Sequence, residues 1–235
     1  MAIVVGGPPR PTVEIPADID HNQIVPTEMP AQTLTVYKRS KISHQLYSTI
    51  IAVPFVAQSW HDHGMDAPTL RTQRLVLLAL GPGDLDEAAA LYGDEAVMRY
   101  VDGGTRDRPT TSHLLEANAR CWKSDGWGLW AVRDAETGAF LGEAGLQRLT
   151  DVAGAQVDYS YTISRRNWDK GIDTEAGNAI LYDAWDRYRG DQIHAIVHPD
   201  DTGRAAVLRK LGFRLEGSRL IHGIEQHVWE VQRLA

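Results

Sequence analysis

Apolar and polar residues follow a regular pattern from residue 71 onward. The apolar run RTQRLVLLAL at 71–80 predicts a strand, and apolar residues at helical spacing predict one helix over 82–101 and a second over 110–126. Two strands are expected in 128–149, where the tripeptide Glu-Thr-Gly marks the turn between them. The first half of this region therefore predicts helices that are followed by antiparallel strands.

The second half continues with strands and helices in alternation. AQVDYSYTI at 155–163 alternates a polar set of residues with an aromatic and aliphatic set, which predicts a strand with one polar face. A helix is expected over 174–189, a strand over 191–199 and a short helix over 200–212, before two last strands at 213–217 and 227–234. The order β-α-α-β-β-β-α-β-α-β-β predicts an α+β fold with a mixed, mostly antiparallel sheet flanked by helices.

The first 69 residues differ in composition, since they hold eight of the eleven prolines. Residues 1–32 show no sustained period and are expected to be extended, while the pattern within 33–58 predicts some order. His61 and His63 lie two residues apart, but two ligands do not make a metal site, so a polar linker is the preferred interpretation and no metal is expected. We therefore divide the chain into a Pro-rich, partly ordered N-terminal extension, 1–69, and one domain, 70–235.

Composition and charge narrow the classes of function. A formal net charge of −7 and 43% hydrophobic residues indicate a globular protein without the basic excess that binding to nucleic acid requires. The start MAIVVGGPPRP lacks a basic region and a long apolar run, so no membrane contact is expected and the cytoplasm is the default location. The single cysteine, Cys121, rules out an internal disulfide and is given no catalytic role.

A glycine-containing basic loop leads directly into the helix expected at 174, in the stretch SRRNWDKGIDTEAGNAI. The free N–H groups and partial positive charge at a helix N-terminus attract anions, and Gly171 lacks the Cβ that would keep a ligand away. The loop therefore has the form of a phosphate site, although it also carries Asp169 and Asp173.

Several blocks of this region, in order and at the proper spacing, resemble the GNAT acetyltransferase superfamily, and within it the Rim-type branch of protein N-terminal acetyltransferases. The blocks are RTQRLVLLAL, DEAVMRYV, WDKGIDTEA and HPDDTGRAAVLRKLGFRLEG, and the resemblance covers residues 70–235. It implies the GNAT fold, in which acetyl-CoA lies between two splayed parallel strands as the co-substrate. The residues expected to bind it are Ile163, Ser164, Arg165, Arg166, Trp168, Lys170, Gly171, Ile172, Asp173, Thr174, Asp201 and Arg204.

Four positions depart from the family pattern. The family usually has glycine where Asp169 stands and glycine or alanine where Asp173 stands; at Asp173 a carboxylate at the expected N-cap position competes with a phosphate for the helix amides. In the second CoA-facing block, Asp201 replaces asparagine, and Arg204 replaces a small hydroxyl residue with a cation that either binds a phosphate or blocks the path of the thioester. Apart from these four positions, Leu208 occupies the region where many relatives have a tyrosine that protonates the leaving thiolate.

An amine acceptor must lose a proton before it attacks a thioester, so a general base is needed. Asp158 is the first choice, because it lies on the polar face of the 155–163 strand and aligns with an acidic residue of many Rim-type relatives. Glu143 and His198 are the second choices, and the main-chain amide near Ile163 and Ser164 is expected to stabilise the oxyanion.

The sequence thus predicts an acyl-CoA-dependent N-acyltransferase that acts by direct attack of a small-molecule or peptide amine. Two other readings remain open. In one, the four departures mark a GNAT-fold protein that binds or converts another small molecule by acid–base chemistry without CoA; in the other, the chain is a non-catalytic interaction module. A homodimer joined through residues 33–58 is compatible with each of these.

Overall fold

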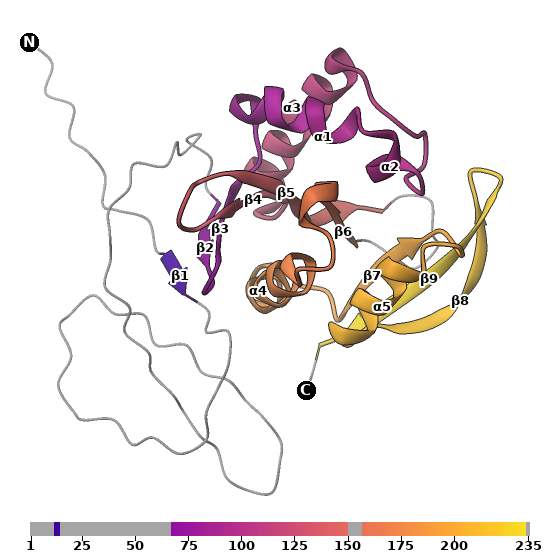
Figure 1. Ribbon diagram of the computed structural model, residues 1–235. Helices are drawn as coiled ribbons and strands as arrows, with labels where there is room; N and C mark the ends of the chain where they lie inside the picture. The colour runs from indigo at the N-terminus through magenta and orange to yellow at the C-terminus, as the bar shows by residue number, and fades with distance from the viewer. Residues whose placement is uncertain (1–11, 15–66, 150–156, 234–235) are drawn as a thin grey trace, which may run out of the picture.

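We describe residues 12–14, 67–149 and 157–233 of a computed structural model (Figure 1). The segments 33–58 and 60–64, for which order and a polar linker were expected, lie outside the described residues. Among the described residues the strands form one nine-stranded sheet in the order β1-β2-β3-β4-β5-β6-β7-β9-β8. The pairs β1–β2 and β6–β7 are parallel and the others are antiparallel, so the expected mixed sheet is confirmed.

The first strands and helices are more divided than the pattern predicted. The run at 71–80 contributes to two short strands, β2 (Thr69–Arg71) and β3 (Leu75–Ala79), because Thr72 closes a tight turn: its amide donates to the Leu75 carbonyl and its Oγ1 accepts from the Leu75 amide. The helix expected over 82–101 is split into η1 (Pro82–Asp84), α1 (Leu85–Tyr92) and α2 (Glu95–Met98), since Asp94 caps a new helix. β1 (Thr12–Glu14) pairs with β2 at the edge of the sheet.

The central elements follow the prediction with shifted ends. α3 (Arg108–Asp125) begins two residues earlier than expected, with Asp107 as its N-cap. The strands β4 (Leu129–Asp134), β5 (Phe140–Arg148) and β6 (Val157–Ile163) form a meander, and α4 (Ile172–Arg187) follows after the short η2 (Arg165–Asn167). β7 (Gln192–Val197), α5 (Thr202–Lys210), β8 (Arg214–Ile221) and β9 (Ile224–Gln232) complete the domain.

Two hydrophobic clusters lie on opposite faces of the sheet. The larger one joins α4 and α5 to the strands and includes Trp130, Ile180, Leu208 and Trp229. The smaller one joins α1, α2 and α3 to the other face through residues such as Leu91, Met98 and Ala131. Figure 1 shows α1–α3 together at one end of the molecule, and α4 and α5 apart from them. Among the described residues no helix is long and apolar enough to cross a membrane.

Candidate active site

The centre of the sheet contains a gap between β6 and β7. One bridged residue pair, Asp158 with His194, joins these parallel strands. Successive residues of a strand direct their main-chain groups alternately to the two neighbouring strands. The Ser164 amide donates to the Leu141 carbonyl of β5 over 2.8 Å, so the main-chain groups of Ile163 and Tyr161 face the other way, into the gap. Of the two amides expected to stabilise an oxyanion, Ile163 is thus the one that faces the gap.

Arg204 reaches into this gap from α5. Its Nη2 donates to the carbonyl of Tyr161, and its Cζ lies 4.6 Å from the centroid of the Tyr161 ring. Burial lowers the pKa of the guanidinium, but the neighbouring Tyr161 and three carboxylates outweigh burial and raise it, so Arg204 is charged. The helix that carries Arg204 is capped as expected by Asp201, whose Oδ1 accepts from the Arg204 amide over 2.9 Å.

Two carboxylates lie on one face of the strands at the gap, the half-buried Asp158 and the buried Glu143. Asp158 accepts a hydrogen bond of 2.9 Å at Oδ1 from the Ile196 amide, and burial raises its pKa to about 7. Glu143, on β5, is 3% exposed and is the cross-strand partner of Thr162; burial raises its pKa as well, and its Oε2 has no hydrogen-bond partner. The positive charge of Arg204 acts on both carboxylates and lowers the pKa of each. A carboxylate that is partly protonated near neutral pH can accept and release a proton, which is what a general base requires.

The third catalytic candidate, His198, lies just beyond β7. Its ring stacks on that of Tyr100 with the centroids 5.4 Å apart, and its Nδ1 accepts from the Asp200 amide over 3.2 Å. The charges that act on Asp158 are those of Arg204 and Glu143. Asp158 and Glu143 therefore form one electrostatic unit, whereas His198 has its own partners near α2.

The loop between β6 and α4 has the expected path but differs in its details. The helix begins at Ile172 with Gly171 as its N-cap, so the predicted start at Thr174 and the predicted N-cap at Asp173 are wrong. Gly171 has φ 71°, a left-handed conformation that glycine adopts without strain. Asp169 is also left-handed, with φ 60°, and is exposed. Aspartate tolerates this conformation better than most residues, which explains how Asp169 can stand where the family usually has glycine.

Asp173 lies in the first turn of α4 instead of preceding it. Its Oδ1 accepts from the Thr174 amide over 2.7 Å, and Thr174 Oγ1 lies 3.3 Å from the same oxygen. Its charge raises the pKa of Tyr159 and Tyr161. Asp173 therefore still competes for the amides of the helix end, although by a different geometry from that of an N-cap.

Further candidates fix the loop. Trp168 Nε1 donates to the Ile163 carbonyl over 2.7 Å, and Lys170 Nζ donates to Asn167 Oδ1 over 3.3 Å. Arg166 Nη2 lies 3.4 Å from the Phe140 carbonyl, while Arg165 is exposed within η2. The Trp168 bond ties the loop to the end of β6, and the Arg166 contact ties it to β5.

Two residues that the sequence reasoning missed also hold this loop. Arg74 donates from Nη1 to the Lys170 carbonyl over 3.0 Å and forms an ion pair of 2.6 Å with Glu175 in the first turn of α4. Thr72 Oγ1 donates to the same carboxylate. Glu175 follows the glycine loop in the sequence, but its partners come from the β2–β3 turn about a hundred residues earlier, and no local pattern could indicate them.

Comparison with known proteins agrees with this arrangement. The family model described as "Acetyltransferase (GNAT) domain" matches residues 74–214. YkkB of Bacillus subtilis (strain 168), an uncharacterized protein, is 30% identical over 152 residues, which cover 63% of this chain and 87% of YkkB. 

Solved structures show the same fold. An acetyltransferase from Agrobacterium tumefaciens str. C58 aligns with a TM-score of 0.63 and 21% identity over 77% of this chain and 100% of its own. RimL, a ribosomal alpha-N-protein acetyltransferase solved in complex with coenzyme A, aligns with a TM-score of 0.58 and 15% identity over 68% of this chain and 94% of its own. The expected likeness to Rim-type proteins is therefore confirmed at the level of the fold, and the chain belongs to the GNAT acetyltransferase family.

Proposed function

We propose that the protein is an acyl-CoA-dependent N-acyltransferase that transfers an acetyl or other acyl group to an amine of a small molecule or peptide. The observation that carries this proposal is the gap between β6 and β7, where the main-chain groups of Ile163 lie on a strand that also carries the half-buried Asp158. An oxyanion donor and a base on one rigid strand are what direct attack on a thioester requires.

The residues of the chain divide the work as follows. The N-terminus of α4 with Gly171 would hold the pyrophosphate of CoA, helped by the cations of the loop, and the Ile163 amide would donate to the acyl oxygen. The CoA thioester supplies the activated acyl group. Asp158 takes the proton of the attacking ammonium, directly or through water, and Glu143 with Arg204 sets the charge around it. No covalent enzyme intermediate is needed, and we place the reaction in the cytoplasm.

Arg204 affects how acetyl-CoA would enter the gap between β6 and β7. Its side chain bonds to the carbonyl of Tyr161, which faces the same gap as Ile163. A thioester that enters here must displace this bond, after which the guanidinium can pair with a phosphate or with the carboxylates nearby. The protein is thus expected to bind acetyl-CoA more weakly than relatives that have a small residue at this position.

A second function is favoured by the same observation. In this case Arg204 stays bonded to the Tyr161 carbonyl and Asp173 stays charged at the helix end, so the gap is closed to CoA. Asp158 and Glu143 then serve acid–base chemistry on another small molecule. The raised pKa values of Asp158 and Glu143 suit both acyl transfer and acid–base chemistry without CoA. Whether the protein binds acetyl-CoA therefore decides between the two functions.

Calorimetric titration of the purified chain with acetyl-CoA decides between the two. We expect saturable binding, followed by release of free CoA thiol when amine acceptors are added. The matched control is Asp158→Asn, which should bind acetyl-CoA as the wild type does and release little thiol. Absence of both binding and thiol release, in a protein that is folded by circular dichroism, would overturn acyl transfer and support the CoA-independent function.

A further inference from the structure

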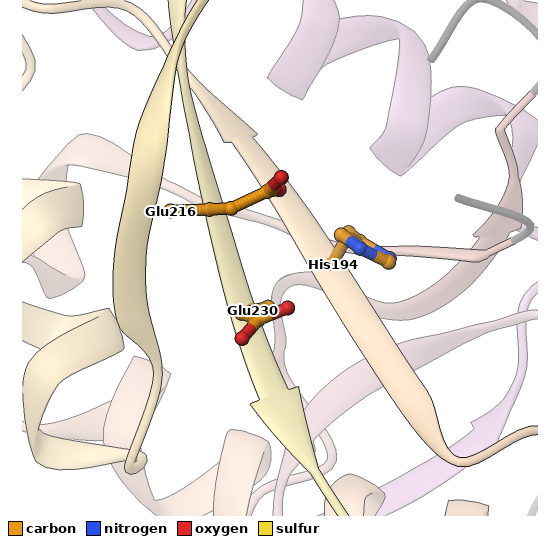
Figure 2. Close-up of side chains that lie close together, drawn as sticks. All are labelled: His194, Glu216 and Glu230. Carbon is orange, nitrogen blue, oxygen red and sulfur yellow. The ribbon is translucent and has the colours of Figure 1, made fainter. Parts of the chain in front are cut away.

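A histidine and two glutamates come together on three neighbouring strands. His194 of β7 is the cross-strand partner of Glu230 of β9, and Glu216 comes from the adjacent β8 (Figure 2). One nitrogen of the imidazole and one oxygen of each carboxylate all lie within 4.8 Å of one another. Sequence reasoning could not find this group, since its members are spread over β7, β8 and β9 without a local motif.

The local geometry of the strands brings these side chains to one face. Ile193 and Ala195 pack in the core that α4 and α5 cover, so the alternation along β7 places His194 on the opposite face. Glu216 lies at a bulge: Leu215 pairs with Trp229 and Gly217 with Val228, so Glu216 is the extra residue on its strand. Bulges re-aim side chains and are a common feature next to functional sites.

His194 carries an unsatisfied polar atom. The residue is 6% exposed, and its Nδ1 is buried without a hydrogen-bond partner. A buried polar atom without a partner is destabilising, so it calls for an explanation such as an ion.

The two carboxylates retain donor atoms for a cation. Arg219 pairs with Oε1 of Glu216, and Gln232 Nε2 lies 3.4 Å from Oε1 of Glu230, so each of these contacts engages one of two oxygens. Arg219 therefore stands as a competitor for any cation at this group.

We propose that His194, Glu216 and Glu230 bind a divalent transition-metal ion of the zinc type. One imidazole and two carboxylates with an open fourth position form a donor set that such ions accept. Ligands at about 2.0–2.2 Å in a tetrahedron lie roughly 3.4 Å apart, so atoms that lie within 4.8 Å of one another need to approach by at most about 1.4 Å, through rotation of the two glutamate side chains. None of its ligands belongs to the loop or helices that would hold CoA, although His194 is the bridged partner of Asp158 at the gap.

Zinc titration of the tag-free full chain, freed of metal by a chelator, tests this site. We measure binding by competition with a chromophoric chelator for the wild type, His194→Ala, Glu230→Gln and the control His113→Ala, whose histidine is exposed on α3. His194→Ala and Glu230→Gln should each weaken the tightest site by more than the roughly 10–100-fold that loss of an outer-shell partner causes. The control should bind as the wild type does.

Arg219→Gln gives a readout that a merely structural role would not produce, because removal of the competing cation should tighten zinc binding. Cobalt, used as a spectroscopic substitute, should give absorption bands of a low-symmetry nitrogen and oxygen site that His194→Ala removes. If wild-type protein shows no saturable zinc binding, or if His194→Ala and Glu230→Gln both bind as tightly as the control, the proposal is wrong. Glu230 is only half-buried, so Glu230→Gln keeps the test valid even if His194→Ala fails to fold.

Discussion

Asp158→Asn is the substitution that tests the proposed base most directly. Asparagine has the same size, and its side-chain oxygen can still accept from the Ile196 amide, so the strand geometry should persist. It cannot accept a proton. We therefore expect turnover of a good amine acceptor to fall by roughly 10²- to 10⁴-fold, the range for loss of general-base help, with little change in acetyl-CoA affinity.

The raised pKa of Asp158 gives this prediction a pH signature. With a pKa of about 7, the carboxylate is ionised in roughly a tenth of the molecules at pH 6, half at pH 7 and nine-tenths at pH 8. The ratio of wild-type to variant turnover should therefore rise about fivefold from pH 6 to pH 7 and then level off. Taking the ratio removes the titration of the amine itself, which is common to both proteins.

Asp158→Asn should lower activity but raise the stability of the fold. A carboxyl whose pKa rises from 3.8 in the unfolded chain to about 7 in the fold favours folding while it is protonated, and this contribution is lost as the pH rises from about 4 through 7. The rise corresponds to roughly 4 kcal/mol as an upper limit. Above pH 7, Asp158→Asn should therefore be less active and yet more stable than the wild type.

The assay is thiol release from acetyl-CoA between pH 6 and pH 9, in the presence of a chelator so that no cation near His194 alters the profile. Denaturant titration at pH 5 and pH 8 gives the stability difference. A wild-type to variant ratio that stays constant with pH would refute the role of Asp158 as the base and move that role to Glu143, His198 or water. A variant that is less stable than the wild type at pH 8 would refute the assignment of a buried, destabilised carboxylate.

Four further predictions concern binding and domain organisation. Asp173→Ala should tighten acetyl-CoA binding by roughly tenfold or more, because a carboxylate no longer competes at the helix end; unchanged calorimetric affinity would show that Asp173 does not contest the site. Arg204→Ser should also strengthen acetyl-CoA binding, and it should move the pH midpoint above about 7, since the Arg204 charge lowers the pKa of Asp158; a lower midpoint would contradict this. Deletion of residues 1–30 should shift the melting temperature by less than about 4 °C, because β1 pairs through only three residues. Limited proteolysis should spare 33–58, and rapid cleavage throughout that segment with an intact domain would remove the idea that it packs on the core.

The sequence predicted the order and type of the elements because burial imposes a period on each of them. Ile180 and Leu181 of α4 and Tyr159 and Ile163 of β6 are buried as their spacing indicated. The alternation in β6 is incomplete, since Tyr161 is half-buried and Thr162 is buried. The ends of elements were less accurate. Thr72 divides the first strand through a local side-chain bond, and Asp94 restarts a helix as its cap; such polar contacts compete with the apolar period without changing it.

The candidate site divides in the same way. Asp158, Glu143 and Arg204 were named from the polar alternation and from the family pattern, and the structure brings their charges together. Other features depend on contacts between segments that are distant in the sequence. These are the packing of Arg204 against Tyr161, the bond of Arg74 to the glycine loop, and the approach of His194 to two glutamates. A single sequence contains no periodicity from which such pairings can be read.

The single bridge between β6 and β7 has a mechanical consequence. Main-chain hydrogen bonds tie the strands on each side of this line to one another, but across it the coupling depends on side chains such as Ile180, Leu208 and Trp229, which belong to one core. The sheet therefore consists of two plates, β1–β6 and β7–β9, and the line between β6 and β7 is the seam that joins them. The C-terminal plate can open locally without breaking a ladder of hydrogen bonds. A ligand that bonds to the exposed edges of both strands would close the seam, and hydrogen exchange at β7 would slow as the two plates begin to unfold as one unit.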